Sequence, residues 1–427
     1  MRIILFLLLV LLTGLSYSQP DTLFLSLEQA LQMAKQSSPQ IKEASIDKTS
    51  GVLSITGSIA QLLPTPTASA SYSKNEITIP GLPANPNYAY TGTVGLNQVL
   101  FSPDVFANVA KGVIYNDYYR LQAQDKLANL VYSLKTSYFN LAKAYQLYAI
   151  AQASFERSQN NYLLAQAKNR LQQITDFELL RSETYLAQAE LDLLSARKNL
   201  LINIEDLKGF IGRVDYEIVK PTTTPSLPEF GIDYEMLLSQ IFEHNLTLQS
   251  VRKTRAIART AFAQSIANLL PSANLFWSST YSDTLMPKKL DTWKNNDVIS
   301  YGVRFSFPVF EIKSYLLNIG NTRNEKLRAV LQLEKAAILL RKTAVNAIYA
   351  CQEAQERYNY AQKNLELNRS LLKLAQEQYR LGALSQLDLF NTEIAFTTAQ
   401  NTYYSALYDA YTSYAQIEYL LGISDSK

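Results

Sequence analysis

The stretch KNRLQQITDFELLRSE (Lys168–Glu183) has a counterpart near the other end of the chain, YRLGALSQLDLFNTE (Tyr379–Glu393), and this repetition decides the fold. When the two stretches are aligned, apolar residues match apolar residues, hydroxyl side chains match hydroxyl side chains, and acids match acids. The matched pairs are Ile174 with Leu384, Thr175 with Ser385, Phe177 with Leu387, Glu178 with Asp388, Leu179 with Leu389, Leu180 with Phe390 and Glu183 with Glu393. Self-similarity at a fixed spacing indicates a duplicated structural unit.

The duplication extends over most of the chain. Three further pairs of segments match at nearly the same spacing: LLPTPTASASY (Leu62–Tyr72) with LLPSANLFWSS (Leu269–Ser279), TVGLNQVLF (Thr93–Phe101) with GVRFSFPVF (Gly302–Phe310), and FIGRVD (Phe210–Asp215) with LLGISD (Leu420–Asp425). We therefore expect two structural repeats, residues 19–220 and 232–427, joined by a linker rich in Pro and Thr at residues 221–231. Each repeat should contain a helix, two strands and a long helical hairpin.

The long helices have the clearest periodicity. Apolar residues recur at every seventh position in both repeats: Leu127, Leu134, Leu141, Tyr148, Phe155 and Tyr162 in the first, and Ala337, Ala344, Cys351, Tyr358, Leu365, Leu372 and Tyr379 in the second. A seven-residue step sustained over several turns predicts coiled-coil seams between antiparallel helices. Cys351 occupies a seam position, so we interpret it as a packing residue.

The segments between the helices alternate in polarity. Tyr301, Val303 and Phe305 are separated by Gly302 and Arg304, and the matching segment of the first repeat alternates as well. Such segments are typical of transmembrane strands in an outer-membrane β-barrel, although a soluble two-faced hairpin alternates equally well. Four such strands per chain cannot close a barrel, because barrels begin at about eight strands and an open edge cannot face lipid. The chain is therefore expected to combine its strands with those of identical copies.

The N-terminus, MRIILFLLLVLLTGLSYSQP, has the features of a secretory signal peptide. It begins with a basic residue, continues with an apolar core and ends in small residues, which predicts cleavage after residue 18. A membrane anchor is the alternative, but the apolar core is shorter than the about 20 residues that a spanning helix needs.

The composition excludes several classes of site. There are 40 basic and 37 acidic residues, with no basic stretch of the kind that binds nucleic acid. A single His (His244) and a single Cys exclude zinc ligand sets, Cys–His nucleophile pairs and disulfides within the chain. With no catalytic motif present, we expect no enzyme, no cofactor and no metal site.

With its motifs in this order, twice over, the mature chain resembles the TolC family of outer-membrane efflux proteins. The resemblance implies a mainly helical fold with a β-barrel contribution. A homotrimer would form a barrel in the outer membrane of a Gram-negative bacterium and a helical tunnel in the periplasm. It also implies docking to a periplasmic adaptor protein and an inner-membrane pump of the RND or ABC type. The implied function is a conduit for efflux or secretion. An exported coiled-coil tether or spacer without a pore is the alternative.

The resemblance also assigns roles at the repeated segment, which would form the turns where the tunnel narrows. Asp388 matches the first inward-facing acid of the family's gate and Asn391 the second, while Tyr379 matches a tyrosine that holds the gate shut. Leu384 stands where the family has an arginine, and Glu178 matches the partner acid in the first repeat. Gly382 matches the glycine at the tip that contacts the adaptor, whereas Gln172 replaces it in the first repeat.

The residues themselves allow two interpretations of the acids. Three Asp388 carboxylates converging on one axis would favour cations at the mouth of the tunnel. Alternatively, Asp388 and Glu178 are solvated residues at helix starts, where the helix dipole favours acids.

Overall fold

The computed structural model describes residues 22–77, 85–212, 218–222, 233–284, 293, 297–307 and 312–423. The expected signal peptide lies outside these residues, as does most of the expected linker. The chain is mostly helical and divides into two compact units. The first unit comprises Met1–Ala44, Gln124–Leu246 and Leu340–Lys427, and the second comprises Ser45–Ala123 and Thr247–Leu339.

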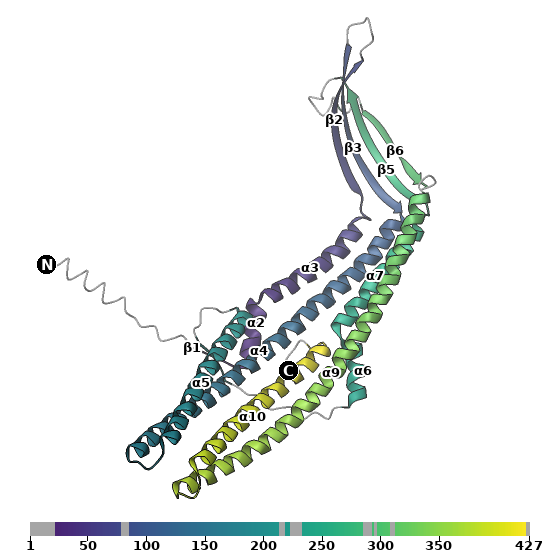
Figure 1. The fold of residues 1–427 in the computed structure, drawn as a ribbon. Coiled ribbons are helices and arrows are strands. Elements are labelled where there is room, and N and C mark those ends of the chain that lie inside the picture. Colours follow the sequence, from purple (N-terminus) through teal and green to yellow (C-terminus); the bar gives the residue numbers. More distant parts are fainter. Residues whose placement is uncertain are drawn as a thin grey trace, which may run out of the picture. The chain divides into compact units, whose positions relative to one another are not determined.

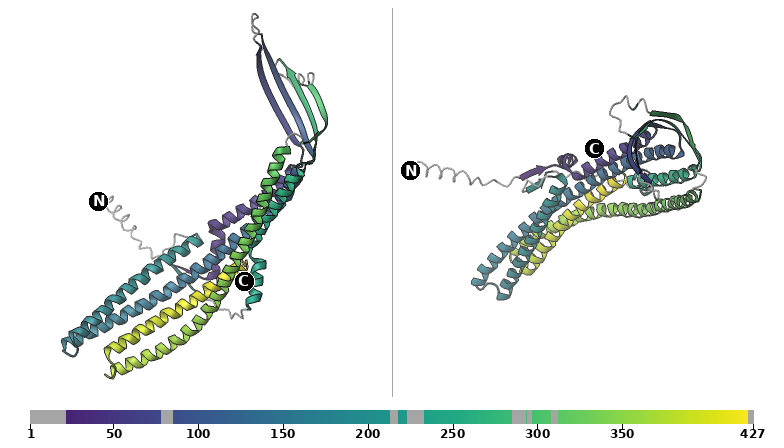
Figure 2. Two further views of the ribbon diagram at one scale, coloured as in Figure 1. Left: turned by 45° about the vertical axis from the view of Figure 1, so that its right-hand side comes forward. Right: turned by 90° about the horizontal axis from the view of Figure 1, so that it is seen from above.

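The first unit is built around two helical hairpins. Its helices are α2 (Leu27–Ser37), α5 (Asp176–Ile211), α6 (Tyr234–His244), α10 (Gln386–Leu420), and the C-terminal parts of α4 (Pro103–Arg170) and α9 (Ile312–Arg380). Figures 1 and 2 show the four long helices of this unit side by side in the order α5, α4, α10, α9. The outer helices of this layer are therefore α5 and α9.

The predicted seven-residue seams are buried at about half of their positions and half-buried at the others. Leu134 and Leu141 on α4 are fully inaccessible to solvent, and Ala344, Cys351 and Leu365 on α9 are also buried. Small residues next to these positions are buried as well, which lets neighbouring helices approach closely. Burial raises the pKa of the Cys351 thiol, consistent with a packing residue.

Two short strands complete the first unit, and no pattern in the sequence predicted them. Strand β1 (Thr22–Leu25) pairs in parallel with β4 (Ile218–Pro221). The hydroxyl of buried Tyr138 donates to the carbonyl of Leu25 at 3.1 Å, and that of Tyr145 donates to the carbonyl of Val219 at 3.0 Å. These two hydrogen bonds attach the small sheet to helix α4. They also satisfy buried carbonyl groups, whose burial without a partner would destabilise the fold.

The second unit contains the main sheet. Strands β2 (Thr65–Ile77), β3 (Asn85–Phe101), β5 (Ser272–Asp283) and β6 (Asp297–Ser306) form an antiparallel sheet in the order β2-β3-β5-β6. The alternating segment around Tyr301 pairs through Ser306, the last residue of β6, and residues 308–310 lie outside the described part. Phe307 precedes a proline, which cannot donate to a strand partner.

The register gives the sheet two chemically different faces. We call one the apolar face; its members include Ala68, Tyr72, Tyr90, Val94, Leu96, Leu275, Trp277, Tyr281, Ile299, Tyr301, Val303 and Phe305. We call the other the polar face; its members include Thr65, Thr67, Ser69, Ser71, Thr91, Thr93, Asn97, Asn274, Ser278, Thr280, Ser300 and Arg304. Opposite residues share a face in an antiparallel pair, so the alternation seen in the sequence is carried across all four strands.

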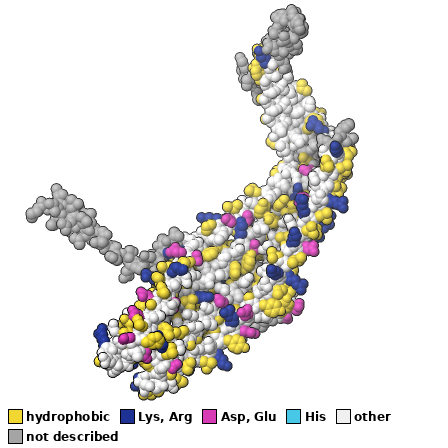
Figure 3. Space-filling model, in the orientation of Figure 1, with side chains coloured by type: hydrophobic (Ala, Val, Ile, Leu, Met, Phe, Trp, Pro, Cys, Tyr) yellow, Lys and Arg dark blue, Asp and Glu magenta, His cyan; other side chains and the backbone are white. Residues whose placement is uncertain are grey.

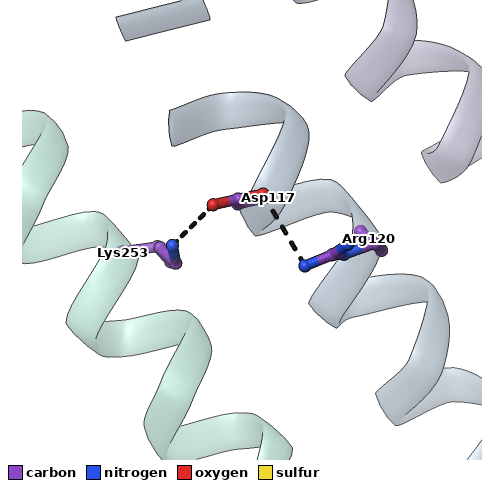
Figure 4. Close-up of polar contacts among 3 residues, drawn as sticks. All are labelled: Asp117, Arg120 and Lys253. Atoms are coloured by element: carbon purple, nitrogen blue, oxygen red, sulfur yellow. Dashed lines mark hydrogen bonds and ion pairs between the residues drawn. The ribbon is translucent and has the colours of Figure 1, made fainter. Parts of the chain in front are cut away.

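Helices α3 (Pro39–Ala60), α4 and α7 (Leu246–Ala267) pack closely in the second unit. Gly112 lies against the Oγ of Ser58 and the backbone carbonyl of Ser54, so even a methyl group would not fit there without a shift. Asp117 on α4 binds Lys253 on α7 at 2.6 Å and Arg120 at 3.7 Å (Figure 4).

Side chains of one charge do not cluster on the visible surface. In the view of Figure 3, basic and acidic side chains are interspersed over the helices, whereas the strands carry few charges. No helix in the described part of the chain is both long enough and apolar enough to cross a membrane.

Candidate functional site at the two helical turns

The turns that join α4 to α5 and α9 to α10 have the same backbone structure. The hydrogen bonds run from Gln172 N to Asn169 O (2.8 Å) and from Gln173 N to Lys168 O (2.9 Å) in the first turn, and from Gly382 N to Tyr379 O (3.1 Å) and from Ala383 N to Gln378 O (2.8 Å) in the second. This pair of bonds is the Schellman motif, which ends a helix through one residue in the left-handed region.

The left-handed residue differs between the turns. Gly382 has a φ of +76°, and Gln172 has a φ of +56°. Among the described residues, Gln172 is the only non-glycine with a positive φ. A side chain in this conformation costs roughly 1–2 kcal/mol relative to glycine, so the first turn is strained where the second is not.

Both expected gate acids lie at the start of a helix and contact the residue that caps it. The Glu178 carboxylate accepts a bond from the Thr175 backbone at 3.0 Å, while Glu178 N donates to the Thr175 hydroxyl at 3.3 Å. The Ser385 hydroxyl donates to the Asp388 carboxylate at 2.6 Å, and Asp388 N donates back to it at 3.1 Å. Each pair satisfies backbone donors that a helix start leaves open. The helix-start interpretation therefore describes both acids within one chain, and Asp388 remains exposed.

Tyr379 contacts a lysine at the end of α4. The ammonium group of Lys168 donates to the Tyr379 hydroxyl at 3.2 Å and lies 4.9 Å from the centre of its ring. This contact joins the ends of α4 and α9. Lys168 was not singled out from the sequence, although it immediately precedes the first turn on a helix expected to lie beside the second hairpin.

The two remaining gate positions carry uncharged side chains. Leu384 is half-buried in the second turn, and Asn391 is exposed one helical turn after Asp388. Nearby, Phe390 packs edge-on against Tyr185 with 4.8 Å between ring centres, and the Gln386 amide donates to the Ser182 hydroxyl at 3.0 Å. These two contacts connect α10 to α5.

Further from the turns, a series of polar contacts connects α4 to α10. The bonds run from Arg157 to Thr397 (3.0 Å), from Asn161 to Glu393 (3.0 Å), from Lys143 to Asp409 (3.0 Å) and from Lys135 to Glu418 (2.6 Å). Burial raises the pKa of Glu393 above its ordinary value, although the Arg157 charge and the Asn161 hydrogen bond act in the opposite direction. Of these residues only Glu393 was noted in the sequence, as the counterpart of Glu183, and none of the contacts was predicted, because the partners are far away in the chain.

A groove between α4, α5 and α10 has a volume of about 610 Å³. Its lining includes uncharged polar residues, among them Asn140, Asn199, Asn203, Asn401 and Ser405. A smaller groove of about 270 Å³ adjoins Arg157 and Glu393. Among the described residues, no group of His, Cys, Asp and Glu is arranged to hold a metal ion.

Comparisons with known proteins agree with this architecture. Residues 237–423 match the model of the outer membrane efflux protein family. The chain is 23% identical to the alkaline protease secretion protein AprF of Pseudomonas aeruginosa, over 79% of this chain and 70% of AprF. It is 23% identical to the outer membrane protein TolC of Escherichia coli, over 97% of this chain and 86% of TolC.

The fold is also similar to that of a solved channel. The crystal structure of the Campylobacter jejuni CmeC outer membrane channel superposes with a TM-score of 0.82 at 17% identity, covering 93% of this chain and 86% of CmeC. The motifs, the paired turns and these matches agree: residues 237–423 match the outer membrane efflux protein family, and the fold is similar to that of a solved outer-membrane channel.

Proposed function

We propose that three copies of this chain form an outer-membrane channel that continues as a tunnel through the periplasm and passes substrates from an inner-membrane pump to the outside. The observation that carries this proposal is the four-stranded sheet. It separates an apolar face from a polar one, and β2 and β6 form its edges in the described part of the chain. Edges of this kind cannot face lipid unpaired.

The apolar face has the dimensions of a membrane band. Tyr72, Tyr90, Tyr281 and Trp293 gather at one end, where Trp293 stacks on Tyr281 with 5.5 Å between ring centres. Phe305 lies on the same face at the other end. Eight residues of β6 separate the row of Tyr281 from Phe305, which corresponds to about 26 Å along the strand and roughly 20 Å perpendicular to the membrane at the usual tilt. Outer-membrane barrels have an apolar band of about 25 Å between two aromatic girdles.

The helical layer offers a way to join copies. On α5, Leu180, Leu194 and Leu201 recur along one face and are 54–65% exposed. On α9, Leu367 and Leu374 are each 61% exposed at the same seven-residue step. Because α5 and α9 lie at opposite sides of the layer, the α5 edge of one copy can pack against the α9 edge of the next. Such head-to-tail contacts close into a ring, and the two proposed sequence repeats, 19–220 and 232–427, would each supply one hairpin to it.

The two turns would then surround the periplasmic end of the tunnel. Exposed Asp388 can contribute to an acidic ring while retaining its bond to Ser385, because a carboxylate accepts several hydrogen bonds. The turn residues Gly382 and Gln172 would face a periplasmic adaptor, which connects the channel to an RND or ABC pump. A tether or spacer would not require the apolar face, and no observation favours it.

Two variants on the same strand test the channel. Tyr301 lies on the apolar face, midway between the two ends of the band, and Ser300 lies on the polar face of β6. A lysine facing lipid near the middle of the membrane costs about 2–4 kcal/mol, whereas one facing water costs little. We expect Tyr301→Lys to reduce insertion into the outer membrane and Ser300→Lys to insert normally.

The wild-type protein provides the reference for this test. It should remain in outer-membrane pellets after salt and carbonate washes, and the purified protein should conduct ions in planar bilayers. Release by salt alone would favour the tether, and insertion without conductance would overturn the channel.

A further inference from the structure

The polar face of the sheet carries one charged side chain among the described residues, and it is Arg304 on β6. Its neighbours on that face are hydroxyl and amide side chains, including Asn274 directly opposite on β5 and Ser306 and Ser300 on the same strand. Thr93 and Thr280 are hydrogen-bonded to each other on the same face at 3.2 Å. A lone cation on a wall without other charges dominates the local potential.

Arg304 is held in place without losing its charge. Its guanidinium lies 4.8 Å from the ring centre of Phe276, which is diagonally opposite on β5. Phe276 is one of the few large apolar side chains on the polar face, and its ring lies beside Gly302, the residue directly opposite on β6. A cation–π contact orients a guanidinium but does not neutralise it. Among the described residues no carboxylate pairs with Arg304, which is exposed.

We propose that Arg304 forms an anion-attracting ring inside the strand-built part of the channel. This inference rests on the proposed trimer, in which the polar face lines the aqueous passage and three copies place three guanidinium groups around it. Rings of Arg or Lys select anions in other pores. The site would take small anions and the carboxylate or phosphate groups of passing solutes, because a guanidinium binds both.

The proposed Arg304 ring carries positive charge, whereas the proposed gate at Asp388 carries negative charge. Asp388 at the helical turns would favour cations, whereas Arg304 favours anions, so a solute would meet the two fields in sequence. Screening limits each field to about 8 Å at physiological ionic strength and to about 30 Å at 0.01 M. The contribution of Arg304 should therefore be largest at low salt.

The test uses purified trimers in planar bilayers under a potassium chloride gradient, with chloride as the probe. We expect Arg304→Gln to lower the chloride-to-potassium permeability ratio by about twofold or more at low salt, and Arg304→Glu to lower it further, with a smaller difference at high salt. Arg304→Lys should keep the wild-type ratio. Lys74→Gln also removes a positive charge but lies on the apolar face, so it should leave the ratio unchanged.

A cysteine variant keeps the test independent of how well a charge-changed chain assembles. The only native cysteine is Cys351, so Arg304→Cys can be made together with Cys351→Ala and modified after the channel has inserted. A cationic thiol reagent should raise chloride permeability and an anionic reagent should lower it.

Three outcomes separate this inference from the channel itself. Wild-type protein that forms no pore overturns the proposed function. Pores whose permeability ratio is the same in Arg304→Gln, Arg304→Glu and wild type overturn the ring and leave the channel intact. An inserted Arg304→Cys channel whose new thiol reacts with neither reagent likewise overturns the placement of Arg304 in the passage.

Discussion

At the scale of single residues, the two turns have the same backbone conformation, but only the second has glycine at the left-handed position. Gly382 and Gln172 occupy the same left-handed position, yet only glycine reaches that conformation without cost. The sequence showed that the two turns match. It did not show the strain at Gln172, because this strain depends on the φ angle of the residue, which only the structure gives.

We expect Gln172→Gly to stabilise the first turn by about 1 kcal/mol, since it relieves the left-handed side chain. Slower hydrogen exchange at Gln172 and Gln173, whose N–H groups make the turn bonds, would show this. Gln172→Ala is the matched control and should bring no gain. If glycine and alanine behave alike, the conformation of residue 172 does not limit the turn.

The proposed acidic ring can be separated from helix capping at Asp388. Asp388→Asn removes the charge but keeps an oxygen that can accept from Ser385, whose hydroxyl donates to the carboxylate. We expect a several-fold weaker block of the channel by divalent cations, because the ring attracts them through charge. Glu178→Gln makes the same change at the other turn. If divalent cations block the Asp388→Asn channel as strongly as the wild type, the only role left for Asp388 is the one at the start of α10.

At the scale of helices and strands, the sequence predicted those elements that have a periodic pattern of apolar residues. The seven-residue step predicted the long helices, and α4 runs from Pro103 to Arg170 without interruption. One helix was expected before the strands of the first repeat, but the structure has two, because α2 ends at Ser37 and α3 begins at Pro39. The residue before a proline disfavours the helical region, and the break follows this rule.

The elements that the sequence did not predict are short or stabilised by distant contacts. Strands β1 and β4 have four residues each, too few for alternation to be recognised. They persist because Tyr138 and Tyr145 bond their carbonyl groups. The contact between Lys168 and Tyr379 was missed for the same reason, since only the packed hairpins bring its two halves together.

Close helix packing in the second unit gives a test at Gly112. Its Cα faces Ser58 and the backbone of Ser54, so Gly112→Val should separate α3 from α4 and destabilise the unit by about 1–3 kcal/mol. Gly57→Ala is the matched control on α3, where nothing lies within 4 Å of an added Cβ. It should stabilise the helix by about 0.5–1 kcal/mol. Thermal unfolding of the detergent-solubilised protein measures both, and equal effects would contradict the close contact.

The contact between α4 and α10 should depend on pH through Glu393. Burial raises the pKa of this carboxyl above the ordinary value of 4.5, so the folded protein binds the proton more tightly than the unfolded chain. Stability should therefore increase as the pH falls from above the folded pKa toward 4.5. The unfolding temperature of the wild type should rise over this range relative to Glu393→Gln, which cannot titrate. Parallel pH profiles would show that another group controls this contact.

At the scale of the whole molecule, one chain has two kinds of exposed edge, at its sheet and at its helical layer. The sheet ends in β2 and β6, and the helical layer of the first unit ends in α5 and α9, each with leucines exposed at a seven-residue step. The proposed ring of three copies would cover both kinds of edge at once. The expectation that strands are shared between copies came from counting strands in the sequence, whereas the leucine edges became apparent only when the order of the helices was known.

The proposed interface places Leu180 on α5 opposite Leu374 on α9 of the next copy. Leu180 lies close after the start of α5 and Leu374 close before the end of α9, so their heights along the hairpins differ by only about 3 Å. Both side chains are 61% exposed in the single chain. Leu180→Glu and Leu374→Lys should each reduce the fraction of SDS-resistant trimer, since each buries an unpaired charge at the interface. Combined in one chain, the two charges face each other across every interface, and the trimer should recover at low salt more than at high salt. Leu163→Glu, on the inner helix α4, should leave assembly unchanged. If the double variant assembles no better than the single ones, α5 and α9 of neighbouring copies do not meet at these residues.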